Sequence, residues 1–170
     1  MVSYMTDEEI EMFYEQAMSY LGQGESKKAI EFFNKALKIN EMYIPAWNDK
    51  GVAFMELKEY SQALDCFQRV GYLDPGIAMP LYNKGYVLLM LERYEEAVET
   101  FRIFLDAYQF KDDFYRYALF LKAQGHYNLK QYDNAIELLE KAIKKDKTFK
   151  EARELLITIL KETKETPVNI

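Results

Sequence analysis

The sequence contains one cysteine, Cys66, four prolines and seven glycines among its 170 residues. A single cysteine excludes an internal disulfide framework and is typical of proteins from a reducing compartment. So few prolines and glycines cannot supply the many turns of an all-β chain, and no alternating β-branched stretch competes with the helical pattern. The scarcity of these residues therefore predicts an all-α fold, and we expect the protein to be cytoplasmic.

Long apolar runs and basic clusters are also lacking. The stretch MVSYMTDEEIEMF reaches two acidic pairs before any apolar run develops, so it predicts neither a signal peptide nor a membrane span. The 22 Lys and Arg and 28 Asp and Glu give a formal net charge of −6, with the two signs interspersed. Because no basic stripe is offered to phosphates, we expect neither nucleic acid nor membrane as a partner.

Signatures of catalysis and metal binding are missing. The chain has no G-x-x-x-x-G-K-[ST], no G-x-G-x-x-G and no H-E-x-x-H, and its single histidine, His126, has no second ligand candidate at metal spacing. We interpret His126 as a core or half-buried histidine and Cys66 as a small buried apolar residue. We therefore expect no enzyme activity, no catalytic residue, no metal site and no cofactor.

Helical signals are plentiful instead. Apolar residues make up 49% of the chain, which is long enough for one domain with a real core. Capping-box patterns that begin at Thr6 and Thr148, together with Pro45 and Pro80 in first-turn positions, predict helix starts at about 7, 45, 79 and 148.

Self-similarity is the strongest signal in the chain. An interval of 34 residues aligns Lys50 with Lys84, Gly51 with Gly85, Leu57 with Leu91, Tyr60 with Tyr94, Ala63 with Ala97 and Phe67 with Phe101. The same interval backwards places Tyr20, Ala29, Phe33 and Ala36 in register, and an interval of 38 forwards places Leu129, Tyr132, Ala135, Leu139 and Ala142. The chain therefore holds four copies of one helix–turn–helix unit, a hairpin that cannot bury its apolar face alone.

The second copy, WNDKGVAFMELKEYSQALDCFQRVGYLDP, resembles the tetratricopeptide repeat. The slots of that family's pattern are filled by Trp47, Gly51, Phe54, Ala63, Phe67, Val70 and Pro75, with Lys50 in place of a leucine. The resemblance implies an all-α, right-handed α-solenoid of antiparallel helix hairpins. It implies a single domain over residues 1–170, with repeats at about 7–43, 44–77, 78–111 and 114–147, a capping helix at about 148–164 and a short tail at 165–170.

Residue size along the repeats supports this resemblance. Small residues recur at two helix positions, occupied by Ala17, Gly51, Gly85 and Ala123 and by Ala29, Ala63, Ala97 and Ala135, so the two helices of each hairpin can approach closely. Bulky residues are expected to wedge between successive hairpins at Phe33, Phe67, Phe101 and Leu139. The segment FKDD, residues 110–113, is an insertion that places the fourth repeat four residues late.

In such an array the first helices of the repeats form a concave groove, and function is expected there. In LYNKGYVLLML, residues 81–91, helical spacing puts Leu81, Gly85 and Leu88 on a core stripe and Tyr82, Tyr86, Leu89 and Met90 on a second stripe. We expect the groove to be lined by Tyr14, Met18, Leu21, Asn48, Val52, Met55, Tyr82, Asn83, Tyr86, Leu89, Tyr117, Phe120, Gln124 and Tyr127. We name these residues the inner stripe.

The composition of the inner stripe, rich in Tyr and Met, favours a non-catalytic protein–protein interaction scaffold that binds an apolar or amphipathic peptide or helix. The alternative is that neighbouring helices cover much of the stripe. Two further hypotheses stay open. The groove could accept the C-terminal helix or tail, Glu151 to Ile170, of another copy, which would make the protein a homo-oligomer; or the chain could be a regulatory subunit of an enzyme complex.

Chaperone-binding members of the resembled family grip C-terminal carboxylates with Lys, Asn and Arg side chains. The corresponding positions here hold Tyr14, Met18, Asp49, Met79 and Asn83 or, one repeat further along, Asn48, Val52, Asn83, Tyr117 and Leu121. Only Asn83 matches, so we expect no carboxylate clamp.

Overall fold

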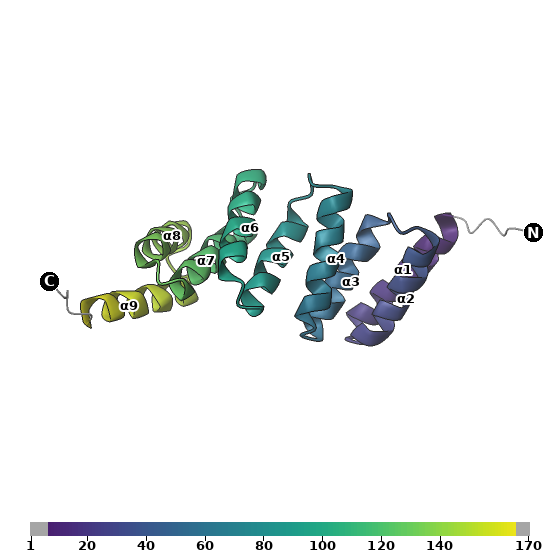
Figure 1. Cartoon of the computed structure of the whole chain (residues 1–170), viewed down its shortest axis with the longest axis horizontal. Helices are drawn as coiled ribbons and strands as arrows, with labels where there is room; N and C mark the ends of the chain where they lie inside the picture. The colour runs from purple at the N-terminus through teal and green to yellow at the C-terminus, as the bar shows by residue number, and fades with distance from the viewer. Residues whose placement is uncertain (1–6, 166–170) are drawn as a thin grey trace, which may run out of the picture. The chain divides into compact units, whose positions relative to one another are not determined.

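The computed structural model describes residues 7–165, and within this range the chain forms helices and no strand (Figure 1). The helices are α1 (Asp7–Gly22), α2 (Ser26–Ile39), α3 (Ile44–Glu56), α4 (Tyr60–Leu73), α5 (Met79–Met90), α6 (Tyr94–Ala107), α7 (Asp113–Asn128), α8 (Tyr132–Lys145) and α9 (Lys150–Glu165). The predicted all-α class is confirmed.

Helix starts follow the sequence signals at three of the four expected places. α1 begins at Asp7, α3 at Ile44 with Pro45 in its first turn, and α5 at Met79. The fourth start, α9, comes at Lys150, two residues later than predicted. The hydroxyl of Thr148 donates to the Asp146 carboxylate at 2.6 Å, so the expected capping box does not form. Thr6, which begins the other capping-box pattern, lies outside the described residues.

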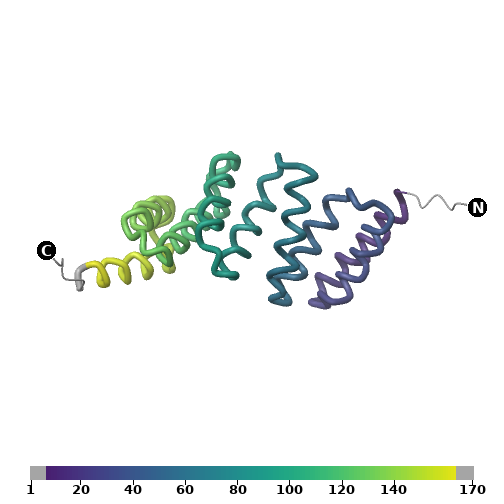
Figure 2. The backbone as a smooth tube through the Cα atoms, in the orientation of Figure 1, coloured from purple at the N-terminus to yellow at the C-terminus, as the bar shows by residue number. Residues whose placement is uncertain are grey.

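Consecutive helices pack as antiparallel hairpins. α1 contacts α2, α3 contacts α4, and α7 contacts α8. Figure 2 shows the backbone of α1 and α2 side by side, joined by the short turn between Gly22 and Ser26. The chain divides into two compact units, of which the first ends at Val87 and the second begins at Leu88, inside α5. The predicted single domain with its repeat boundaries stays a prediction.

The recurring small residues and the bulky residues are both buried in the core, but Phe67 lies against Gly51 of its own hairpin, whereas its spacing predicted a place between successive hairpins. The recurring alanines Ala17, Ala29, Ala63, Ala97, Ala123 and Ala135 are fully buried. Phe33, Phe67, Phe101 and Leu139 are at most 1% exposed. A Cβ added to Gly51 would lie 2.7 Å from the Phe67 ring, so this position permits a close approach that only glycine allows.

The same turn closes each hairpin. Gly24, Lys58, Glu92 and Lys130 stand at equivalent positions of the repeats, and all four have positive φ, 75° at the glycine and 58° at each of the others. At the second turn, the Lys58 N–H donates to the Met55 carbonyl and the Glu59 N–H to the Phe54 carbonyl, both at 2.9 Å. These bonds use helix-end carbonyls that would otherwise lack partners.

A glycine at one of these turns is expected to stabilise the protein. Lys58 holds a left-handed backbone that costs a residue with a Cβ about 1 kcal/mol, and Lys58→Gly removes that strain. We expect a net gain of about 0.5 kcal/mol in the free energy of unfolding, because glycine also makes the unfolded chain more flexible. Denaturant unfolding checks this. Gln68→Gly, at an exposed position in the interior of α4, is the matched control and should destabilise the protein by about 1 kcal/mol.

The inserted segment lies between α6 and α7. Asp112 caps α7 by accepting a hydrogen bond from the Tyr115 N–H at 3.3 Å, and its second carboxylate oxygen accepts one from the Tyr108 hydroxyl at 2.8 Å. Phe110 is 68% exposed. The four extra residues therefore lengthen the connection and start the next helix, without entering the core.

Candidate functional site

In the first unit, α1 and α3 are in contact, which places Tyr14, Met18 and Leu21 on one helix and Asn48, Val52 and Met55 on its neighbour. Met18 is 38% exposed, and the other five are half-buried. This part of the inner stripe therefore keeps an accessible surface that is mostly apolar.

A polar network ties these two helices together. The Tyr14 hydroxyl donates to one oxygen of Asp49 at 2.6 Å, and the side-chain amide of Asn48 donates to the other at 2.8 Å. The Tyr14 ring meets Tyr43 edge to face with centroids 5.5 Å apart, and the Tyr43 hydroxyl donates to Glu11 at 2.9 Å. The hydroxyl of Tyr14 therefore fixes helix packing and is not offered to a ligand.

Burial and neighbouring carboxylates keep both phenols neutral. Burial, followed by the hydrogen bond to Asp49, raises the pKa of Tyr14 well above its ordinary value. Burial, followed by the hydrogen bond to Glu11, raises the pKa of Tyr43 to about 12. Both side chains stay protonated donors at neutral pH, so the network persists there.

On α5, the inner-stripe residues differ in exposure. Tyr82, Asn83 and Tyr86 are half-buried. Leu89 is only 5% exposed, which corrects the expectation that it faces an open groove. A Cβ on Gly125 would lie 3.5 Å from its Cδ2, so the side chain packs against α7. Leu89 lines a cavity of about 300 Å³ together with Gln124, another inner-stripe residue.

Of the residues predicted for the core stripe of α5, Leu88 and Gly85 are buried, as expected. Leu81 is half-buried, so that part of the stripe is less enclosed than its spacing predicted.

In the second unit, α9 contacts α7 and covers part of the inner stripe. Tyr117 is 37% exposed and meets Phe149 edge to face at 4.9 Å between ring centroids, and Phe120 lies 5.3 Å from the same ring. The Tyr127 hydroxyl donates to Glu162 at 2.8 Å. The coverage foreseen as the alternative therefore applies to these residues of α7.

An arginine completes this cluster and was not identified from the sequence. The guanidinium of Arg116 lies 5.4 Å from the Tyr117 ring centroid and 5.1 Å from that of Phe149, and it donates to Asp146 at 2.6 Å. Hydrogen bonds from Thr148, with Arg116 also contributing, hold the pKa of Asp146 below its usual value. The sequence did hold a usable signal for the tyrosine–carboxylate pairs, because Tyr14–Asp49 and Tyr127–Glu162 share a separation of 35 residues.

His126 and Cys66 have the burial that the sequence predicts for them. His126 is half-buried, with its Nδ1 2.6 Å from the side-chain oxygen of Gln131. Cys66 is 3% exposed, and burial raises the pKa of its thiol to about 11. Among the side chains that the structure describes, residues 7–163, no three of His, Cys, Asp or Glu converge as a metal site would require. Over the same range no helix combines the length and apolar character needed to cross a membrane.

The Cys66 thiol is expected to react slowly with a disulfide reagent at pH 8. A pKa about two units above the ordinary value lowers the thiolate fraction about a hundredfold, and burial blocks access further. Absorbance of the released thiol measures the rate, and the same protein in denaturant is the control. A native rate equal to the denatured rate would contradict the burial of Cys66.

Comparison with known proteins identifies the family to which this arrangement of helices belongs. One tetratricopeptide repeat family model matches residues 48–112 and 82–148, and another matches residues 10–43. The Hsp70-Hsp90 organising protein of Plasmodium falciparum is 32% identical over 100 residues, covering 57% of this chain and 18% of that protein. BBSome complex member BBS4 of Bos taurus is 33% identical over 103 residues, covering 61% of this chain and 19% of that protein. The matched stretch thus spans under a fifth of either relative.

A solved structure shows the same fold. MamA from Desulfovibrio magneticus RS-1, residues 41 to the end, superposes with a TM-score of 0.87 at 21% identity, covering 94% of this chain and 88% of that one. The repeat spacing, the antiparallel hairpins and the family models agree over most of the chain. The chain is an α-solenoid and belongs to the tetratricopeptide repeat family.

Proposed function

We propose that this chain is a non-catalytic protein-interaction module that binds an apolar or amphipathic segment of a partner on the inner stripe of α1 and α3. Tetratricopeptide repeat proteins generally mediate protein–protein interactions. Two relatives carry names that tie them to other proteins, an organising protein of Hsp70 and Hsp90 and a BBSome complex member. We place this function in a reducing compartment because the only cysteine is a free thiol.

One observation carries the proposal. None of the inner-stripe residues is charged, although charged residues make up 29% of the chain, and all of them except Leu89 keep part of their surface exposed. An accessible uncharged surface with Tyr and Met is suited to a partner that contributes apolar side chains, since Tyr gives anchoring area and Met adapts to shape.

Binding at the stripe would be measurable if enough apolar surface of the two partners is covered. Covering about 600 Å² of apolar surface would contribute roughly 15 kcal/mol, against an association cost of about 4 to 15 kcal/mol. The difference supports dissociation constants in the micromolar range or below when the ligand is preorganised. Affinity at this site then depends on how well the ligand's shape fits the stripe.

Selection from a displayed peptide library tests the proposal without knowledge of the partner. We expect selected peptides to present apolar residues at helical or alternating spacing, and to lose binding at least about tenfold to Met18→Glu and Val52→Glu, because a carboxylate would be desolvated at the contact. Met42→Glu is the matched control, since Met42 is 64% exposed and off the stripe. Peptides that bind all three variants equally would overturn the proposal.

A peptide that ends in acidic residues and a free carboxylate is not expected to bind this stripe. Asp49 stands at one of the clamp positions, and its two oxygens already accept the Tyr14 hydroxyl and the Asn48 amide. A ligand carboxylate placed there would meet a like charge and find those donors engaged. Calorimetric titration with such a peptide should give no heat at millimolar concentration, and micromolar binding would contradict the prediction.

A further inference from the structure

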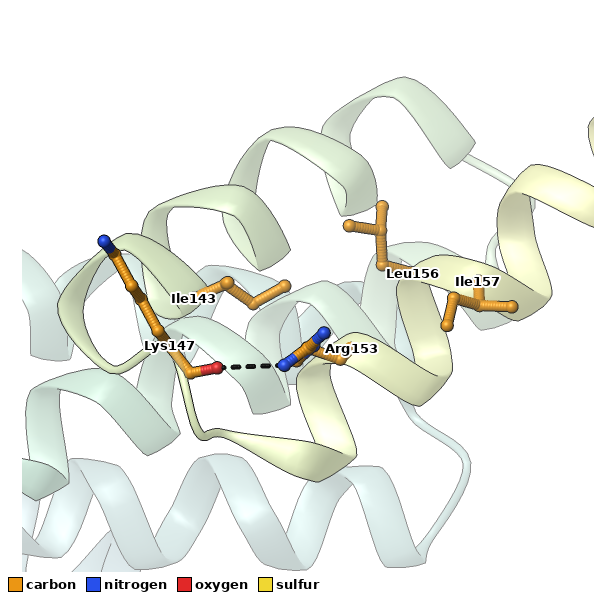
Figure 3. A pocket seen from close by; sticks show the side chains of 5 residues that line it. All are labelled: Ile143, Lys147, Arg153, Leu156 and Ile157. Carbon is orange, nitrogen blue, oxygen red and sulfur yellow. Dashed lines mark hydrogen bonds between the residues drawn. The ribbon is translucent and has the colours of Figure 1, made fainter.

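The helices α8 and α9 and the turn between them line an open pocket that is separate from the inner stripe. Figure 3 shows Ile143, Leu156 and Ile157 around it, with Lys147 and Arg153 at its rim. Its volume is about 440 Å³. Ile157 is 51% exposed, and Leu160, one turn further along α9, is 40% exposed. The apolar floor therefore continues as an exposed row on α9.

The rim of this pocket is basic. The two charged residues that line it, Lys147 and Arg153, are both cationic, in a chain whose net charge is −6. Arg153 donates one N–H to the Lys147 carbonyl at 3.2 Å, a contact that fixes the guanidinium beside the floor (Figure 3). Within the described residues, neither Lys147 nor Arg153 has an ion-pair partner, so both charges are available to an acidic ligand.

The sequence supplies a surface of matching character in α1. This helix carries five acidic residues and no Lys, Arg or His. Glu8, Met12 and Glu15 follow one another at four- and three-residue intervals on a single exposed face, and Met12 is 44% exposed. One apolar side chain flanked by two carboxylates is the pattern that an apolar pocket with a basic rim would accept.

We propose that the pocket between α8 and α9 binds the acidic outer face of α1 from a second copy of this chain. Met12 enters between Ile143, Leu156 and Ile157, and the flanking carboxylates pair with Lys147 and Arg153. The charge complementarity of the two surfaces identifies the occupant. Because the two surfaces differ, the contact is heterologous, and each added copy leaves a free surface for the next unless a ring closes. This association does not use the inner stripe.

Sedimentation velocity over a range of protein concentrations tests this contact. We expect reversible association that weakens roughly tenfold between about 50 and 500 mM NaCl, because the ion pairs lie at the surface. Two charge-reversed proteins, one with Glu8→Lys and Glu15→Lys and the other with Lys147→Glu and Arg153→Glu, should each sediment as monomers. Mixed together they should form a complex, since the mixture again pairs a basic with an acidic surface. Circular dichroism confirms that each variant is folded.

The control carries Lys27→Glu and Lys38→Glu, two exposed lysines of α2, and should associate as the unaltered chain does. Ile157→Asp, in the apolar floor of the pocket, should abolish association although it changes the net charge by only one unit. A chain that stays monomeric at every concentration, or charge-reversed proteins that associate as well as the unaltered one, would overturn the proposal. If the chain stays monomeric at every concentration, the pocket does not bind a second copy.

Discussion

Phe67→Ala is expected to lower the free energy of unfolding of the first unit by about 3 to 5 kcal/mol. The Phe67 ring is 1% exposed and lies against Gly51 of the facing helix α3, so it fills the space between the two helices of a hairpin. Its removal forfeits the transfer free energy of the ring and leaves a cavity that a rigid hairpin cannot close. Fluorescence of Trp47, the only tryptophan and a residue of the same unit, reports the unfolding.

Tyr72→Ala, on the same helix α4, is the matched control. Tyr72 is 78% exposed, so its loss should change stability by no more than about 0.5 kcal/mol. Equal costs for the two substitutions would mean that Phe67 is not packed in the hairpin as described.

Gly51→Ala is expected to destabilise the first unit by about 1 to 2 kcal/mol, although alanine is the better helix former. The added Cβ would lie 2.7 and 2.8 Å from two atoms of the Phe67 ring and 3.2 Å from the Cβ of Cys66. A buried ring cannot withdraw from this contact without strain, so overpacking outweighs the gain in helix propensity. The same unfolding measurement, followed at Trp47, gives the size of the effect.

Gly71→Ala is the natural contrast, because Gly71 lies inside α4 with no heavy atom within 4 Å of an added Cβ. This change should stabilise the protein by about 0.5 to 1 kcal/mol. Adding Phe67→Leu to Gly51→Ala removes the ring atoms that clash, so the double variant should cost less than the sum of the single changes. Strict additivity would show that Gly51 and Phe67 do not meet.

The hairpin arrangement could be predicted because the repeat spacing records it directly. Ala29, Ala63, Ala97 and Ala135 recur with the period of the repeat, and all are fully buried. The left-handed turns at Lys58, Glu92 and Lys130 could not be predicted, because only Gly24 among the four equivalent positions carries the residue typical of that backbone. At these turns the helix-end hydrogen bonds outweigh the local preference of a side chain with a Cβ.

The inner stripe could be predicted only in part, because helical spacing locates a face without showing what covers it. Met18 is exposed as a groove requires, whereas Leu89 lies beneath the surface against α7. The partners of the tyrosines escaped prediction, because Asp49 and Glu162 are ordinary acidic residues in the sequence and gain their role from the neighbouring helix. The coverage of Tyr117 by Phe149 depends in the same way on the position of α9.

Methyl signals of the chain's methionines give the most direct test of binding at the inner stripe. Met18 and Met55 belong to the stripe, and Met42 lies outside it on the turn between α2 and α3. In methyl-labelled protein titrated with a peptide from the library selection, we expect the signals of Met18 and Met55 to move together with the peptide concentration while that of Met42 stays in place. Movement of Met42 with Met18 and Met55 unchanged would contradict binding at the inner stripe.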